Sequence, residues 1–183
     1  MDFTESRLST RAVFDGTLLH VREDEVRLPD GKTAVREWMD HRGAAVIVAF
    51  DEEDRLLLVR QYRYPLQGEL LELPAGKLDP GETPEQGAAR ELAEETGYAA
   101  GRLTLLGRLA PAAAYTSEVL YVYLAEELTL CGQHLDEDEF LAVERWRLED
   151  ALALLDEDEL IDAKTQIGLL RYLRLQDQKR TNC

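Results

Sequence analysis

The first part of the chain alternates apolar and polar residues. Alternation runs through residues 13–28, a Pro-Asp-Gly-Lys turn follows at 29–32, and alternation resumes at 33–40. Successive side chains of a strand point to opposite faces, so a period of two interrupted by a turn is typical of hairpins. We therefore expect an antiparallel β-meander over residues 11–40.

Shorter and more apolar runs follow the meander. Residues 44–50 and 55–62 are rich in Val, Leu and Ala and flank an acidic turn at 51–54. Such runs predict a second, more buried hairpin. Residues 69–76 predict another strand, which ends in a loop that contains proline and glycine.

Clear helix signals begin after this loop. Thr83 can cap the helix, Pro84 stands at the first helical position, and Gln86 completes a capping box. Gly97 is placed to end the helix. Further strands are expected at 102–110, 118–128 and 142–148, and helices at 148–157 and 162–176. Strands interleaved with a few helices predict an α/β sandwich whose sheet is mixed or antiparallel.

Composition limits the size and the partners of the protein. A chain of 183 residues fits one ordinary domain with at most a small appendage, and 45% hydrophobic residues suffice for a buried core. The formal net charge of −16 argues against binding to nucleic acid or anionic membranes, which need a positive field. A phosphate substrate stays compatible with this charge, because bound divalent cations reverse the local sign.

Cysteine usage and the apolar runs bear on the compartment. Cys131 and Cys183 lie far apart and no CxxC motif exists, which argues against a zinc site or a disulfide framework. The opening MDFTESRLST has neither a basic region nor an apolar run, so we do not expect a signal peptide. The apolar stretch 44–50 is too short to span a bilayer. We expect a cytoplasmic protein.

The predicted helix after Thr83 gathers carboxylates on one face. Residues three and four apart share a helix face, so Glu91, Glu94 and Glu95 project together. Converging carboxylates are unfavourable without a cation, and oxygen ligands suit Mg²⁺ first and Mn²⁺ next. Glu82 and Arg90 can form an ion pair across the preceding loop. The alternative is a solvated acidic face that binds no metal.

The spacing of the whole segment separates these alternatives. The stretch GKLDPGETPEQGAARELAEETGY resembles the Nudix box, G-x5-E-x7-R-E-U-x-E-E-x-G-U, in which U is a bulky apolar residue. The matching positions are Gly76, Glu82, Arg90, Glu91, Leu92, Glu94, Glu95, Gly97 and Tyr98. The resemblance implies a Nudix fold, an α/β/α sandwich with a mixed sheet. It also implies hydrolysis of a nucleoside diphosphate that is linked to another moiety.

The resemblance also implies roles for the residues of the box. Glu91 and Glu95 would be the main metal ligands, and Glu94 a further ligand or an orienting group. The backbone carbonyl of Ala75, just before the box, would be another ligand, with Mg²⁺ as the cation and Mn²⁺ as a substitute. Arg90 and Glu94 are also counted with the catalytic groups. The positions that shape the box would be Gly76, Gly97 and the ion pair of Glu82 with Arg90.

Sequences outside the box are similar to the ADP-ribose pyrophosphatase branch of the Nudix family. The similar stretches are 58–65, 71–82 and 162–170. In that branch a small N-terminal β subdomain is exchanged between two subunits, and the active site is built across the dimer. The resemblance thus implies a dimer-exchanged antiparallel subdomain at 1–42 and a Nudix hydrolase domain at 43–183, in a homodimer.

Three residues outside the box match substrate-binding positions of relatives. Trp38 lies where some relatives stack a tryptophan on adenine, and its alternative is a buried strand residue. Arg63 matches an arginine that contacts the phosphates of the substrate, and its alternative is a surface arginine with no partner. Arg60 is a further candidate for the same task.

The general base of this branch usually lies on a late loop. The matching segment here is 133–146, and its candidates are Glu137 and Glu139. An acidic loop is otherwise most often a solvated surface, and the alignment of motifs is what favours this segment.

One departure from the branch concerns the substrate. ADP-ribose hydrolases commonly carry a serine-proline-glycine turn that shapes the pocket for the distal sugar, and here Ala113 stands at the proline position. The expected reaction is hydrolysis of ADP-ribose to AMP and ribose 5-phosphate. GDP-mannose, ADP-glucose and a dinucleotide are alternative substrates. A non-catalytic Nudix ligand sensor and a cation-buffering protein are alternatives from other classes.

Overall fold

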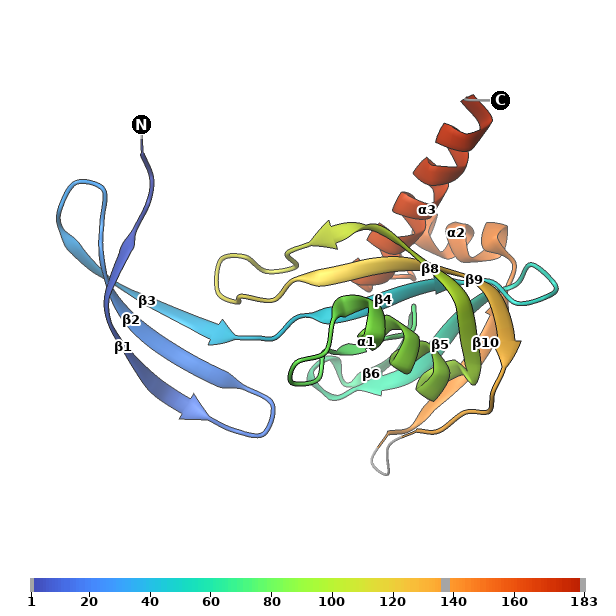
Figure 1. Ribbon diagram of the computed structural model, residues 1–183, viewed down its shortest axis with the longest axis horizontal. Coiled ribbons are helices and arrows are strands. Elements are labelled where there is room, and N and C mark those ends of the chain that lie inside the picture. Colours follow the sequence, from blue (N-terminus) through green and yellow to red (C-terminus); the bar gives the residue numbers. More distant parts are fainter. Residues whose placement is uncertain (1, 136–138, 182–183) are drawn as a thin grey trace. The chain divides into compact units, whose positions relative to one another are not determined.

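The computed structural model describes residues 2–135 and 139–181 of the chain (Figure 1). Backbone contacts divide the chain into two compact units. The first consists of Met1–Gly43 and Ala110–Val119, and the second of Ala44–Leu109 and Leu120–Cys183. The first unit therefore includes a segment from the middle of the chain as well as the N-terminal residues.

The first unit contains an antiparallel three-stranded sheet. β1 (Ser6–Asp15) pairs with β2 (His20–Arg27), which pairs with β3 (Thr33–Asp40). The expected meander is present, and its first strand begins earlier than residue 11. Every residue of β1 is exposed.

The middle segment of the first unit is attached to the end of β3. The N–H of Met39 donates to the carbonyl of Tyr115 at 2.8 Å, and the N–H of Ser117 donates to the carbonyl of Met39 at 3.0 Å. The side chain of Ser117 accepts from the N–H of His41 at 2.8 Å. These bonds hold the turn that contains Ala113 beside the strand that carries Trp38.

The second unit contains two sheets. One has the strand order β7-β4-β9-β8, in which β4 and β9 are parallel, and the other has the antiparallel order β10-β5-β6. Their strands are β4 (Ala44–Ala49), β5 (Leu56–Arg63), β6 (Gly68–Glu72), β7 (Ala75–Lys77), β8 (Tyr98–Leu109), β9 (Leu120–Leu130) and β10 (Leu141–Trp146), with a 3-10 turn η1 (Tyr64–Leu66) before β6.

The expected second hairpin is wrong. β4 and β5 lie in different sheets, and only an isolated bridge between Phe50 and Leu56 joins their ends. β4 is buried throughout, with Val46 and Val48 in one apolar cluster and Ile47 in the other. A strand covered on both faces has its place at the centre of a sheet, between β7 and β9.

The strand expected at 69–76 is also wrong in extent. It is divided into β6, which pairs with β5, and β7, which pairs with β4. The N–H of Leu73 donates to the side chain of Thr165 at 2.8 Å instead of to a strand. Pro74 has no N–H to donate, so the ladder cannot continue through it.

Helices cover both faces of the four-stranded sheet. α1 (Pro84–Glu91) contributes Ala88 to one apolar cluster, while α2 (Leu148–Asp156) and α3 (Ala163–Thr181) contribute Ala151 and Leu169 to the other. This arrangement confirms the expected α/β/α sandwich with a mixed sheet. Within the described residues, no helix combines the length and the apolar character needed to cross a membrane.

Candidate active site

Local sequence signals fix the start and the end of the helix that carries Glu91, Glu94 and Glu95, which we call the carboxylate helix. The predicted capping box is present, because the N–H of Gln86 donates to the hydroxyl of Thr83 and the N–H of Thr83 donates to the Gln86 side chain at 2.9 Å. α1 is shorter than expected and continues as a π-helical turn, η2 (Leu92–Thr96). Gly97 ends this turn with a φ of 75°, a conformation that favours glycine.

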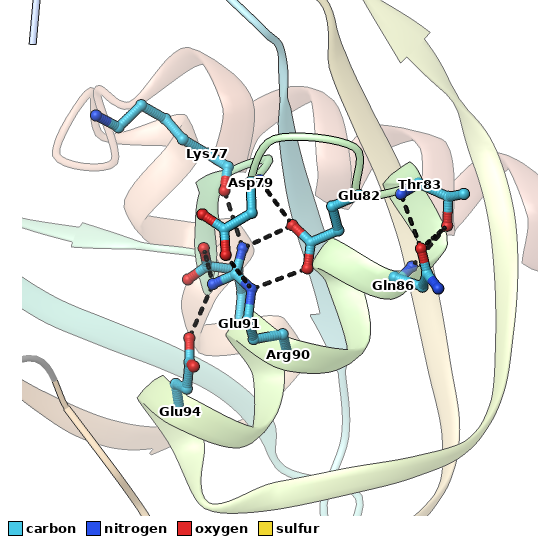
Figure 2. Close-up of polar contacts among 8 residues, drawn as sticks. All are labelled: Lys77, Asp79, Glu82, Thr83, Gln86, Arg90, Glu91 and Glu94. Carbon is cyan, nitrogen blue, oxygen red and sulfur yellow. Dashed lines mark hydrogen bonds and ion pairs between the residues drawn. The ribbon is translucent and has the colours of Figure 1, made fainter.

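Arg90 is the cation among the carboxylates of the box. Its Nε and Nη2 each donate to the carboxylate of Glu82 at 2.9 Å, so the expected ion pair is present. Its Nη1 donates to Glu91 at 2.8 Å and to Glu94 at 2.9 Å, and Nη2 also reaches the carbonyl of Lys77 (Figure 2). These carboxylates, Glu82 first, raise the pKa of Arg90.

Glu91 and Glu95, which we call the buried pair, both have raised pKa values. Burial raises the pKa of Glu91 to about 7, with Arg90 opposing the rise. Burial and then the charge of Glu91 raise the pKa of Glu95 to about 8. Glu95 is 1% exposed and accepts from the N–H of Ala75 at 3.0 Å. Both carboxylates therefore favour protonation near neutral pH unless a cation joins them.

The backbone of β7 closes around Glu91. A Cβ added to Gly76 would lie 2.0 Å from the carboxyl group of Glu91, so only glycine fits there. Among the described residues, no three His, Cys, Asp or Glu side chains converge into a ready metal cage. Glu91 and Glu94 both accept hydrogen bonds from Nη1 of Arg90.

The donor set nevertheless fits a hard divalent cation. Glu91 and Glu95 supply buried carboxylate oxygens of raised pKa, and Ala75 brings its backbone next to Glu95. Oxygen ligands with uncompensated negative charge are what Mg²⁺ and Mn²⁺ bind. Glu94, whose side chain is 39% exposed, lies at the rim, where it can add a further oxygen.

The loop after β9 is fixed to the end of the carboxylate helix. The N–H of Cys131 donates to the carbonyl of Gly97 at 2.8 Å, and the N–H of His134 donates to the carbonyl of Glu94 at 3.1 Å. The charge of Glu139 contributes to the raised pKa of Glu91 and of Glu95, so this carboxylate lies within electrostatic reach of both. Glu137, the other expected base, lies outside the described residues.

The two candidate arginines both have partners. Nε and Nη2 of Arg63 donate to the buried carboxylate of Glu72 at 2.7 and 2.6 Å, so Arg63 is not a surface arginine without a partner. Nε of Arg60 donates to Glu144 at 2.5 Å.

Trp38 belongs to the first unit. Its indole N–H donates to Asp24 at 3.0 Å, and the side chain is half-buried on β3. The bond to Asp24 fixes the orientation of the ring, while part of its surface stays open.

Sequence reasoning missed the residues that surround Arg63. Glu72 also accepts from Lys164 in the first turn of α3, and Lys164 lies 3.1 Å from Asp162. One signal was available: Glu72 is a charged residue within the apolar run LLELP, at a strand end that proves to be buried.

Comparison with known proteins identifies the chain. A family model described as NUDIX domain matches residues 39–165, and one described as nucleoside diphosphate sugar hydrolase N-terminal domain matches residues 5–39. The chain belongs to the Nudix family. The box residues of this Nudix hydrolase, Gly76 to Tyr98, all lie within the range matched by the NUDIX domain model.

Similar proteins cover nearly the whole Nudix chain. The ADP-ribose pyrophosphatase of Bacillus subtilis is 40% identical over 94% of this chain and 94% of its own length. The methanol dehydrogenase activator of Bacillus methanolicus is 37% identical over 96% and 95%. A crystal structure of an ADP compounds hydrolase superposes with a TM-score of 0.86 at 28% identity and covers 98% of both chains.

Proposed function

We propose that this Nudix hydrolase cleaves the pyrophosphate bond of a nucleoside diphosphate sugar, and that ADP-ribose, yielding AMP and ribose 5-phosphate, is its substrate. The observation that carries the proposal is the buried pair, Glu91 and Glu95, two carboxylates one helical turn apart whose pKa values are raised mainly by burial. Relatives named for ADP-ribose and for ADP compounds, similar over nearly the full chain, support the choice of substrate.

The proposed cofactor is Mg²⁺, with Mn²⁺ as a substitute. Glu91, Glu95 and the carbonyl of Ala75 would hold it, and Glu94 would add a ligand or orient one. When bound, such a cation stabilises charge on the phosphoryl oxygens and lowers the pKa of a water molecule. Arg90 has a different task in this proposal: through Glu82 and the carbonyl of Lys77 it holds the loop before α1 in place.

The chain's own residues would position the substrate and move one proton. Arg63 donates from its remaining nitrogen to a phosphate oxygen, Arg60 assists at the rim, and Trp38 stacks on adenine. Glu139 or Glu137 accepts a proton from the attacking water. The water oxygen forms a new bond to phosphorus as the bridging P–O bond breaks, and the bridging oxygen leaves with the second phosphate.

A homodimer with a shared site is part of the proposal. The match of residues 5–39 to the N-terminal domain of nucleoside diphosphate sugar hydrolases supports it, as do the exposed apolar residues of β1, among them Leu8, Val13 and Phe14. Exposed apolar side chains on a strand become favourable when a partner covers them. Sedimentation that shows only a 20.8 kDa species would contradict this arrangement. We also propose a cytoplasmic location.

A second candidate is a regulatory role without catalysis. The relative named methanol dehydrogenase activator favours it, because that name describes an effect on another protein. The intact glutamates of the box favour catalysis instead.

A substrate panel with Mg²⁺ tests the proposed function. It would contain ADP-ribose, ADP-glucose, GDP-mannose, UDP-glucose, NADH and diadenosine polyphosphates, with the nucleotide products followed by chromatography. Preferential release of AMP from ADP-ribose, abolished by Glu95→Gln, would support the proposal. Preference for another nucleotide sugar would keep the reaction and change the substrate. No turnover that depends on Glu95 would favour the regulatory role.

A further inference from the structure

A second cluster of charged residues lies close to the box but outside the carboxylate helix. Its centre is Glu72, the last residue of β6, which is 1% exposed. Arg63 donates to this carboxylate through Nε at 2.7 Å and Nη2 at 2.6 Å, and Nζ of Lys164 donates to it as well. We refer to Arg63, Glu72 and Lys164 as the Glu72 cluster.

The first turn of α3 fixes the Glu72 cluster to the sheet. Asp162 accepts from the N–H and the hydroxyl of Thr165 at 2.9 and 2.6 Å, which caps the helix. The hydroxyl of Thr165 accepts in turn from the N–H of Leu73 at 2.8 Å. The stretch Asp-Ala-Lys-Thr thus bonds to Glu72, the last residue of β6, and to Leu73, which follows it.

The same stretch of backbone leads directly into the box. Pro74 donates no hydrogen bond, but its carbonyl accepts from Ile47 at 2.9 Å, and the N–H of Ala75 donates to Glu95. Attraction to Lys164 lowers the pKa of Glu95, opposing its burial, and the charge of Glu95 contributes to the raised pKa of Arg63. Both cations of the Glu72 cluster therefore lie within electrostatic reach of the proposed metal site.

The geometry leaves one edge of Arg63 available. Glu72 uses Nε and Nη2, and within the described part of the chain no hydrogen bond involves Nη1. The side chain of Arg63 is 40% exposed, so Nη1 can donate to a phosphate oxygen while Glu72 keeps the other edge. An arginine held along one edge loses less conformational freedom when it binds a ligand with the other.

Lys164 limits how strongly the carboxylate of Glu72 attracts the guanidinium of Arg63. With Lys164 present, one carboxylate serves two cations, and Lys164, 14% exposed, is itself fixed by Asp162. Without it, the buried carboxylate would have Arg63 as its counter-ion and would draw the guanidinium inward, away from a phosphate. We propose that Lys164 is a positioning residue, which acts through Glu72 to hold Arg63 in the orientation that binds the pyrophosphate of the substrate.

This inference rests on the proposed function and is tested by separating KM from kcat. Lys164→Met should raise KM for the nucleotide sugar roughly tenfold, with kcat changed less than about twofold, as expected from a weakened charge-assisted contact to the substrate. Lys164→Arg, which keeps the cation, should restore KM to within about threefold of the wild type. Lys179→Met, at an exposed position of the same helix, is the matched control.

A double-mutant cycle shows whether Lys164 acts through Arg63. In an Arg63→Met background, Lys164→Met should leave KM unchanged, because the contact it supports is already absent. Equal KM effects in both backgrounds would overturn the proposal. A loss of kcat and of melting temperature with KM unchanged would also overturn it, since that pattern describes a residue that only stabilises the fold.

Binding of ADP distinguishes failure of this inference from failure of the proposed function. Calorimetry of ADP with Mg²⁺ needs no turnover, and Lys164→Met should weaken Kd by a factor similar to its effect on KM. If no nucleotide sugar is hydrolysed but ADP binding weakens in this way, the proposed function fails and the positioning role stands. Unchanged ADP binding in Lys164→Met, with substrates hydrolysed normally, would refute the role of Lys164 alone.

Discussion

Glu72 and Glu95 are two carboxylates of equal burial, each 1% exposed, that the protein compensates in opposite ways. Burial raises the pKa of Glu72, but Arg63 and Lys164 outweigh it and the pKa falls below its usual value. Glu95 has the N–H of Ala75 and the repulsion of Glu91, and its pKa rises to about 8. One buried charge has its counter-ions within the chain, and the other is the one for which we propose a cation from solution.

The largest effect is expected from Glu95→Gln. Loss of a ligand that stabilises charge in the transition state by several kcal/mol should lower kcat on the order of a thousandfold. The same variant should melt at a higher temperature than the wild type at pH 8 without Mg²⁺, because it removes a buried, poorly compensated charge. Activity assays and calorimetry measure the two effects. A variant that loses both activity and stability would contradict the account.

The pH dependence of stability should follow the buried pair. A carboxylate whose folded pKa exceeds its unfolded value binds more protons in the folded state, so stability falls as pH rises between the two values. For Glu91 this window runs from the ordinary carboxyl pKa of 4.5 to about 7, and for Glu95 from 4.5 to about 8. We expect the melting temperature to fall by roughly 10 °C between pH 5.5 and 8 without Mg²⁺.

Glu72 contributes nothing to the slope of melting temperature against pH between 5.5 and 8. Its lowered pKa means that its stabilising contribution is present above 4.5 and is lost only as pH falls further. Saturating Mg²⁺ should flatten the curve between pH 5.5 and 8, and Glu95→Gln should flatten it without Mg²⁺. A slope that is the same in this variant and in the wild type would assign the effect to other groups.

Glu72→Gln should act on stability in the direction opposite to Glu95→Gln. Removing the carboxylate leaves the half-buried Lys164 with Asp162 as its remaining ion-pair partner among the described residues. The loss should cost about 2–3 kcal/mol, less than for a fully buried pair because Arg63 is partly exposed. Denaturant unfolding measures the change. Glutamine is close to glutamate in size. A neutral or stabilising result would therefore mean that Arg63 and Lys164 do not stabilise the charge of Glu72.

Glu82→Gln should have the smallest effect of the series. Glu82 has Arg90 as a bidentate partner and its pKa is lowered, but its side chain is 11% exposed, against 1% for Glu72. We expect a loss of about 1 kcal/mol in the free energy of unfolding. Glu85→Gln, in the exposed first turn of α1, is a control that should change nothing measurable. A loss of unfolding free energy in Glu82→Gln as large as that in Glu72→Gln would contradict the expected difference between the two ion pairs.

Much of this architecture could be predicted from the sequence, and the failures have physical causes. The capping box at Thr83, the glycine stop at Gly97 and the alternation of the meander are local signals, and each appears in the structure. The split between β6 and β7 depends on Thr165, which lies far along the chain, so no local pattern reveals it. The separation of β4 from β5 likewise depends on which helices cover β4.

The candidate site divides in the same way. The spacing of Glu82, Arg90 and Glu91 could be predicted because a motif fixes it, and the structure brings these residues together. Glu72 and Lys164 were missed because their importance comes from burial and from each other, across two elements. A charge at a strand end shows its role only when its partners in space are known.

The most direct test of the central claim is calorimetric titration of Mg²⁺ into the wild type and Glu95→Gln, near pH 7, in two buffers of different ionisation enthalpy. Ligands of raised pKa must lose protons when metal binds. We expect the wild type to bind Mg²⁺ with release of roughly one proton. We expect Glu95→Gln to lose most of this binding. Equal binding of Mg²⁺ by both proteins, or binding without proton release, would contradict the claim that Glu91 and Glu95 bind a cation.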